Sequence, residues 1–230
     1  MYYIEASDIE RLREEASLDG QRATRVQAVS TYLWKALAGV VATTSDEHCR
    51  MGWWVNGREL VTEPSLRAEL RNYFGNVATF TEREVSVQDV LQMPLPDVAA
   101  IVRGTTTMTP EYDEHLQELV DWVEEHKNKR YIEAASIGLG SPAVIVEAFT
   151  SFALDTDFGF GHAALAVPAA VLTPRLCSGL VRLIPKPGCD GSWIVSAVVW
   201  PALATELESD EPRVFKPLTA EYLGMLAPQV

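Results

Sequence analysis

The chain has 230 residues, of which 47% are hydrophobic and 22% are charged, as in folded globular proteins. Its 19 basic and 32 acidic residues give a formal net charge of −13, which argues against anionic partners such as duplex nucleic acid or a membrane surface. No apolar run approaches the roughly 18 residues of a membrane span, and the charged N-terminus does not resemble a signal peptide. The three scattered cysteines fit neither a disulfide framework nor a zinc site. We therefore expect a cytoplasmic protein with free thiols and no metal.

The first elements expected along the chain are a short strand and a helix. Tyr2–Glu5 is aromatic and β-branched, which favours a strand. Ser7 and Glu10 have the spacing of a capping box, in which the serine caps the helix and the glutamate reaches back. We therefore predict a helix from about Asp8 to Ala16, ended by Gly20.

A second, amphipathic helix is predicted to begin after Thr24, which can cap it. Apolar residues then recur at three- and four-residue steps, which is the period of a helix. They are Val26, Val29, Leu33, Leu37 and Val40. We expect this stripe to pack against the core, with Trp34 adding bulk.

The middle of the chain is predicted to hold two strands and a long helix. Met51–Asn56 has the pattern of a strand that ends in a turn at Asn56-Gly57, and Phe74–Phe80 has the pattern of another strand. The most regular helix is expected from Pro110 to about Lys127. Its core-facing residues are expected to be Leu116, Leu119, Val120 and Val123.

The last third of the chain is rich in strand-forming residues. We expect strands at Ala143–Phe149, Leu180–Ile184 and Trp193–Val199, with Gly188–Ser192 as a hairpin loop between the last two. A final helix is expected at about Pro201–Glu208. Strands and helices that alternate without a repeat or a disordered linker indicate a mixed α/β fold, with helices packed on a β-sheet, and a single domain over residues 1–230.

A search for catalytic motifs finds no metalloprotease, redox, hydrolase or phosphate-loop pattern. His115 and His126 are expected on the surface of the long helix, whereas His162 directly follows a glycine-rich motif, where a functional and an ordinary structural role are both open. Asp155 and Asp157 are separated by one residue, so on a strand they would point to the same face, and no histidine is evidently near them. We interpret one as solvated and the other as paired with an arginine.

The glycine-rich motif is Asp157-Phe158-Gly159-Phe160-Gly161, and it resembles the DFGWG signature of the plant BAHD acyltransferases, with phenylalanine replacing the usual tryptophan. Other stretches resemble the same family in the expected order. They are Val26–Lys35, Val55–Leu60, Tyr73–Asn76 and the hairpin Gly179–Val199 with its Asp190-Gly191 loop. The resemblance covers nearly the whole chain and is to the C-terminal half of the family.

The resemblance implies one half of a two-lobed fold like that of chloramphenicol acetyltransferase, and transfer of an acyl group from acyl-CoA to an alcohol or amine of a plant specialised metabolite. The family's catalytic base lies in an HxxxD motif of the N-terminal half. The residues four places after the histidines are Gly52, Leu119, Arg130 and Ala166, so HxxxD is absent. Because loss of a general base costs roughly 10²–10⁴-fold, we assign no catalytic residue and predict that the chain alone is not a competent acyltransferase.

The resemblance also implies a structural role for the signature. In the family its aspartate pairs with an arginine away from the catalytic histidine, and Arg58 matches that arginine here. A buried carboxylate needs such a partner, because an unpaired buried charge costs several kcal/mol. Gly159 and Gly161 permit tight turns behind Asp157, and Phe160 keeps the aromatic bulk of tryptophan without its N–H donor.

A CoA contact is implied for Gln21–Arg25, because the matching region of relatives approaches the CoA phosphates. Arg22, Thr24 and Arg25 offer two cations, a hydroxyl group and the N–H groups of a helix N-terminus, which together suit a phosphate. Ordinary capping by Thr24, with solvated arginines, is the alternative, and both interpretations stay open.

Three interpretations of the whole chain follow. In the first, the chain is half of an acyltransferase and needs a complementary N-terminal half from a longer product or a separate chain. In the second, it is a truncated non-catalytic module that binds CoA esters or a full-length relative through an exposed apolar face. In the third, it is a gene-model fragment with no independent role.

Overall fold

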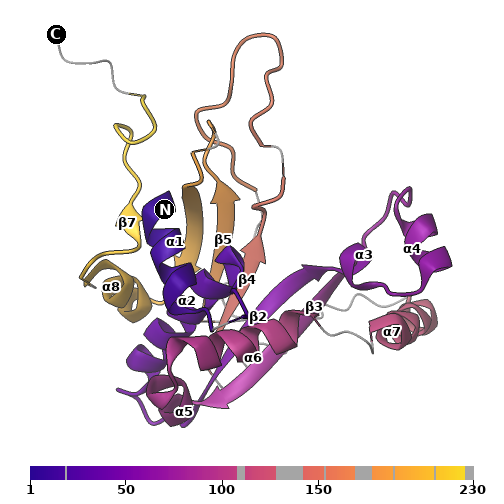
Figure 1. Cartoon of the computed structure of the whole chain (residues 1–230), viewed down its shortest axis with the longest axis horizontal. Helices are drawn as coiled ribbons and strands as arrows, with labels where there is room; N and C mark the ends of the chain where they lie inside the picture. The colour runs from indigo at the N-terminus through magenta and orange to yellow at the C-terminus, as the bar shows by residue number, and fades with distance from the viewer. Residues whose placement is uncertain are drawn as a thin grey trace.

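A seven-stranded mixed β-sheet forms the centre of the molecule (Figure 1). The computed structural model describes residues 1–18, 20–107, 112–127, 142–152, 154–168, 178–188, 190–209 and 211–225. The strand order is β3-β2-β4-β5-β6-β1-β7. The pairs β2–β4 and β4–β5 are parallel, and the other neighbouring pairs are antiparallel. The predicted mixed α/β class is therefore confirmed.

The elements follow the predicted order, with two additional helices between the second and third strands, two more after the third strand, and a short strand after the last helix. The strands are β1 (Tyr2–Ile4), β2 (His48–Asn56), β3 (Ala78–Ser86), β4 (Ala143–Ala148), β5 (Gly179–Pro185), β6 (Trp193–Val199) and β7 (Lys216–Pro217). The helices are α1 (Ala6–Glu15), α2 (Arg25–Val41), α3 (Gly57–Leu60), α4 (Pro64–Leu70), α5 (Val87–Gln92), α6 (Leu95–Thr107), α7 (Tyr112–His126) and α8 (Pro201–Ser209). The expected hairpin is formed by β5 and β6.

Helix α2 begins after Thr24, as predicted, and Thr24 forms a capping box with Gln27. The Thr24 hydroxyl accepts a hydrogen bond from the Gln27 N–H at 3.1 Å, and the Gln27 side chain accepts one from the Thr24 N–H at 2.8 Å. The two bonds satisfy N–H groups that a helix start leaves unpaired. The predicted apolar stripe is confirmed too, since Val29, Leu33 and Leu37 are fully buried.

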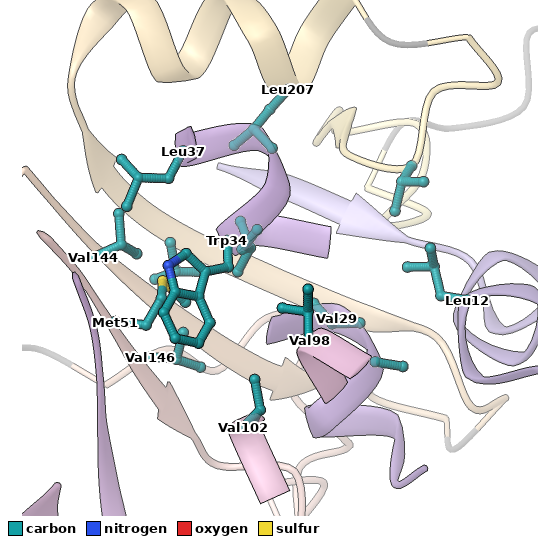
Figure 2. Close-up of a cluster of buried hydrophobic side chains, with 14 of the residues drawn as sticks. Leu12, Val29, Trp34, Leu37, Met51, Val98, Val102, Val144, Val146 and Leu207 are labelled. Carbon is teal, nitrogen blue, oxygen red and sulfur yellow. The ribbon is translucent and has the colours of Figure 1, made fainter. Parts of the chain in front are cut away.

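The main core lies between the sheet and a layer of helices on one of its faces, with α2 in contact with α1, α5, α6 and α8. Figure 2 shows Trp34 of α2 among aliphatic side chains from the sheet, including Val144 and Val146 of β4. The Trp34 indole N–H donates to the Cys49 sulfur at 3.3 Å, which satisfies a buried donor that an apolar core could not.

The opposite face of the sheet carries a smaller apolar cluster. Ala143, Ile145 and Leu180 are buried there, with Trp54 and Phe80 packed against them. The alternation along β4 and β5 explains this division, because successive side chains of a strand point to opposite faces.

Two local expectations are wrong. Helix α1 begins at Ala6, with Glu5 at the cap position and no side-chain cap, so Ser7 forms no capping box. The strand expected from Phe74 begins only at Ala78, and Phe74 is fully exposed. The partner strand explains the later start, because β2 ends at Asn56, opposite Ala78, and Asn56 then caps α3.

The long helix is confirmed, but only part of its predicted inward face is, because Leu116 and Leu119 are partly buried whereas Val120 and Val123 are not. Its expected start at Pro110 lies outside the described residues, and Val120 and Val123 are each 49% exposed. Figure 1 gives the reason: α7 lies with α3 and α4 beyond the end of β2 and β3, away from the sheet face that the other helices cover. Within the described ranges, no helix combines the length and hydropathy needed to cross a bilayer.

Candidate functional site

Three arginines surround one carboxylate near the start of α2. The Glu10 carboxylate of α1 lies 3.3 Å from Arg13, 3.4 Å from Arg22 and 3.4 Å from Arg25. The cluster therefore keeps two uncompensated positive charges on a chain whose net charge is −13. The Arg22 side chain is 64% exposed, so it is accessible to a dissolved anion.

Arg25 also ties this cluster to the turn between β5 and β6. Its guanidinium carbon lies 5.1 Å from the ring centroid of Trp193, and its Nη2 donates to the carbonyl of Gly191. The structure thus brings together the three residues of the predicted CoA contact, Arg22, Thr24 and Arg25, at the N-terminus of a 17-residue helix. The Thr24 hydroxyl oxygen already accepts the Gln27 N–H as a helix cap. Its O–H group is still available to donate a hydrogen bond to a phosphate oxygen.

The signature loop is held by its own backbone. One carboxylate oxygen of Asp157 accepts hydrogen bonds from the N–H groups of Gly159 at 2.7 Å and Gly161 at 3.0 Å. These bonds, from Gly159 first and Gly161 second, lower the pKa of Asp157. Gly159 and Gly161 have φ angles of 95° and 109°. Residues with a Cβ atom rarely adopt such positive φ angles, so this turn requires the two glycines.

The expected ion pair between Asp157 and Arg58 is not formed, and the expectation is wrong. Asp157 is exposed, so it needs no buried partner. The Arg58 guanidinium donates instead to the carbonyls of Tyr73, at 3.1 Å, and Gly75. Arg58 therefore braces the loop between α4 and β3 rather than the signature loop.

The two aromatic residues of the signature point outward. Phe158 is 75% exposed and Phe160 is 88% exposed, and their rings stack on each other with centroids 6.2 Å apart. This apolar pair covers no core in the described part of the chain.

A histidine–carboxylate pair in the same loop was missed by sequence reasoning. The Nδ1 atom of His162 lies 2.9 Å from Oδ1 of Asp155, and Oδ2 of Asp155 accepts a hydrogen bond from the Gly188 N–H at 3.0 Å. The interpretation that no histidine lies near Asp155 is therefore wrong. No sequence pattern signals the pair, because both residues lie in an irregular segment without a helical or strand period.

The histidines of α7 differ from each other. The surface position expected for His115 is wrong, because its Nε2 is buried and has no hydrogen-bond partner among the described residues. His126 is partly exposed, and its Nδ1 lies 2.8 Å from the Trp122 carbonyl oxygen. Over the part of the chain that the structure covers, no group of three or more potential ligands could hold a metal ion.

Comparison with known proteins identifies the class of this fold. The model of the Transferase family matches residues 1–210, so the chain belongs to this family, the BAHD acyltransferases. The resemblance found in the sequence motifs is therefore confirmed.

Individual relatives agree with this assignment. The chain is 25% identical over 168 residues to the omega-hydroxypalmitate O-feruloyl transferase of Arabidopsis thaliana, a match that covers 73% of this chain and 34% of that protein. Its fold is similar to TRI101 of F. graminearum in complex with coenzyme A and deoxynivalenol, with a TM-score of 0.72, 15% identity, and coverage of 94% of this chain and 48% of that one. Vinorine synthase gives a TM-score of 0.57 at 18% identity, over 98% of this chain and 46% of that one. The chain thus spans about a third of the curated relative's length and about half of the solved structures.

Proposed function

We propose that this chain is the C-terminal half of an acyl-CoA-dependent acyltransferase, which moves an acyl group from a CoA thioester to a hydroxyl or amine group of a small molecule. Family membership supports this proposal, as do fold relatives about twice as long, among them one solved with coenzyme A. The complementary half supplies the proton acceptor, because no histidine of this chain begins an HxxxD motif. Alone, the chain binds CoA but does not accelerate acyl transfer.

The arginine cluster at the start of α2 is the observation that carries this proposal. A CoA molecule is polyanionic, and an acidic protein repels it unless local positive charge dominates. Arg13, Arg22 and Arg25 outnumber Glu10 by two charges. Arg22, Thr24 and Arg25 then hold a CoA phosphate through charge-assisted hydrogen bonds beside the positive end of α2.

Reversing the charge of the two outer arginines tests the site. We expect CoA binding, measured by calorimetry at low salt, to be lost in the double variant Arg22→Glu/Arg25→Glu. The matched control is Arg67→Glu/Arg71→Glu, which makes the same charge change on the exposed surface around α4 and should leave the affinity within about twofold. Equal affinity in wild type and the first variant would remove this CoA site.

Removing the negative charge should have the opposite effect. Glu10→Gln frees the guanidinium groups of Arg22 and Arg25 for a phosphate, and a unit charge a few ångströms away is worth about 1 kcal/mol in water. We expect CoA to bind about fivefold more tightly at low salt, with the gain shrinking as salt is added. Glu14→Gln, an exposed neighbour on the same helix, is the control. A weaker or unchanged affinity in Glu10→Gln contradicts the proposed role of the cluster.

A non-catalytic binding module is the second candidate, and the exposed aromatic pair favours it. Phe158 and Phe160 present two large rings to solvent, and exposed apolar surface often marks a protein contact. On this reading the purified chain self-associates or binds a full-length relative, and Phe158→Ser/Phe160→Ser abolishes the association in size-exclusion chromatography. A monomer that binds neither CoA nor a relative would exclude this candidate.

A further inference from the structure

Three loops join the sheet at the same end. β2 runs parallel to β4, and β4 runs parallel to β5, so these three strands finish on the same side of the sheet. β3 starts opposite the last residue of β2. The loop between α4 and β3, the loop after β4 and the β5–β6 turn therefore all meet this end, which we call the carboxyl end of the sheet. Figure 1 shows the loop after β4 extending beyond the tips of β4 and β5.

The most exposed large apolar side chains of the described residues belong to loops at the carboxyl end. They are Phe74, in the loop between α4 and β3, and Phe158 and Phe160, in the loop after β4. Phe74 is fully exposed, and the other two are 75% and 88% exposed. Large apolar side chains that reach this far into water often mark a contact with another protein.

Two hydrogen bonds from Arg58 fix the backbone on both sides of Phe74. The guanidinium donates to the carbonyl of Tyr73, at 3.1 Å, and to that of Gly75. A Cβ atom at Gly75 would stand 2.2 Å from the Tyr73 ring, so Tyr73 lies against a position where only glycine fits. Phe74 is therefore presented by a loop that is already ordered, and an anchor of this kind loses little conformational entropy when it binds.

The loop after β4 presents its two phenylalanines in a similar way. The hydrogen bonds from Gly159 and Gly161 to the Asp157 carboxylate fix the backbone around them. The rings of Phe158 and Phe160 stack on each other above this turn. Two aromatic anchors, Phe74 and the Phe158–Phe160 pair, thus stand on ordered loops at one end of the sheet.

The loop after β4 is also poor in charge. Among residues 149–168 the only Asp, Glu, Lys or Arg side chains are Asp155 and Asp157, in a chain with 22% charged residues. Both carboxylates accept backbone N–H groups, Asp157 from the two glycines of its turn and Asp155 from Gly188 at 3.0 Å. The centre of a protein–protein interface is likewise depleted in charged residues and enriched in aromatic ones.

The length of the fold relatives indicates what binds at the carboxyl end. The fold of TRI101 matches 94% of this chain, and the match covers only 48% of TRI101, so that protein holds this fold together with a second part of similar size. A second copy of this chain is a poorer occupant, because two molecules with a net charge of −13 repel each other. The same charge disfavours nucleic acid and an anionic membrane.

We propose that the carboxyl end of the sheet is the surface on which the complementary half docks, with Phe74 and the Phe158–Phe160 pair as two anchors that enter apolar pockets of that half. Arg58 and Asp157 are positioning residues, because each holds the backbone that presents an anchor. The inference rests on the proposed function, and it names the surface through which the two halves would assemble.

A separate N-terminal half tests this surface. The probe is that half of the omega-hydroxypalmitate O-feruloyl transferase of Arabidopsis thaliana, checked for folding by circular dichroism and titrated by calorimetry into the purified chain. We expect Phe74→Ser and Phe158→Ser/Phe160→Ser each to weaken binding about 30-fold, as the loss of a buried aromatic anchor does. Leu91→Ser is the control, because Leu91 is also exposed but lies on α5, at the other end of the sheet, and its affinity should stay within about twofold of wild type.

Equal affinity in wild type and both anchor variants, or no binding of the folded half by wild type, would overturn the docking surface. Self-association of wild type that the same variants abolish, without binding of the half, would assign the surface to a second copy and would also contradict the proposal. Thiol release from acyl-CoA separates this inference from the proposed function. Turnover stimulated by the added half, with affinities unchanged in the variants, refutes the docking surface alone, whereas docking that depends on the anchors without any turnover refutes the proposed function alone.

Discussion

The hydroxyl groups of Tyr112 and Thr79 lie 2.7 Å apart, and both side chains are fully buried. This hydrogen bond fastens the first residue of α7 to β3. Gly57 lies against the same hydroxyl, because a Cβ at that position would stand 1.9 Å from the Tyr112 oxygen. The start of α7 is thus attached at a tightly packed point, whereas Val120 and Val123 further along the helix are exposed.

Tyr112→Phe should therefore destabilise the protein although it changes one atom. The Thr79 hydroxyl loses a partner inside the protein, and an unsatisfied buried polar group costs about 1–3 kcal/mol. Urea unfolding measures the free-energy change, and Tyr73→Phe, at a residue that is 56% exposed, is the control. A similar, small loss in both variants would show that the Tyr112–Thr79 bond contributes little.

The pair Arg182–Glu147 predicts a non-additive effect on stability. The two side chains meet at 2.6 Å on neighbouring strands, with Arg182 5% and Glu147 21% exposed. Arg182→Leu leaves a largely buried carboxylate unpaired and should cost about 3 kcal/mol, whereas Arg182→Leu/Glu147→Leu should recover most of that loss, since apolar pairs often replace buried ion pairs at little cost. Additive losses in the double variant, measured by urea unfolding, would contradict this account.

The order of the signature loop should depend on pH through Asp157. Its pKa is lowered by the Gly159 and Gly161 N–H groups, so the ionised carboxylate stabilises the folded loop. This contribution is complete above the ordinary aspartate pKa of about 3.9 and disappears as pH falls through the lowered pKa. The Gly159 and Gly161 amide signals should shift together in that acid range.

Asp157→Ala should abolish this acid transition and speed amide exchange of Gly159 and Gly161 at neutral pH. Asp97→Ala, at an exposed residue on α6, should leave both signals unchanged. Unaltered exchange in Asp157→Ala would mean that the glycine backbone, and not the carboxylate, fixes the loop.

The Cys49 thiol should resist alkylation while the protein is folded. Burial raises its pKa to about 11, against a smaller opposing effect of the Trp34 hydrogen bond, and only the thiolate reacts rapidly. In the background Cys177→Ser/Cys189→Ser, we expect iodoacetamide at pH 8 to modify Cys49 no faster than the protein unfolds. Rapid alkylation of the folded protein would contradict the burial of this thiol.

The sequence predicts best those elements whose pattern and packing agree. Helix α2 combines a cap at Thr24 with an apolar stripe that the sheet buries, so both its start and its inward face are confirmed. The stripe of α7 is equally regular, yet Val120 and Val123 are exposed, because periodicity indicates a helix but not which surface lies opposite.

The candidate sites show the same limit. The arginines before α2 are neighbours in the sequence, so their proximity could be expected, but their shared partner Glu10 lies on α1. Asp155 and His162 meet through an irregular loop that has no period to reveal them. Arg58 was assigned to Asp157 by family resemblance alone, and nearby carbonyls and glycine N–H groups satisfy the two side chains separately.

Acyl-CoA turnover tests the proposed function most directly. Thiol release from a panel of acyl-CoAs, with alcohol and amine acceptors, should be at background for the purified chain and should rise when an N-terminal half that carries HxxxD is added as a separate chain. That stimulation should be lost when the added histidine is replaced by alanine. Turnover by the purified chain alone, without any added half, would contradict the claim that its proton acceptor lies elsewhere.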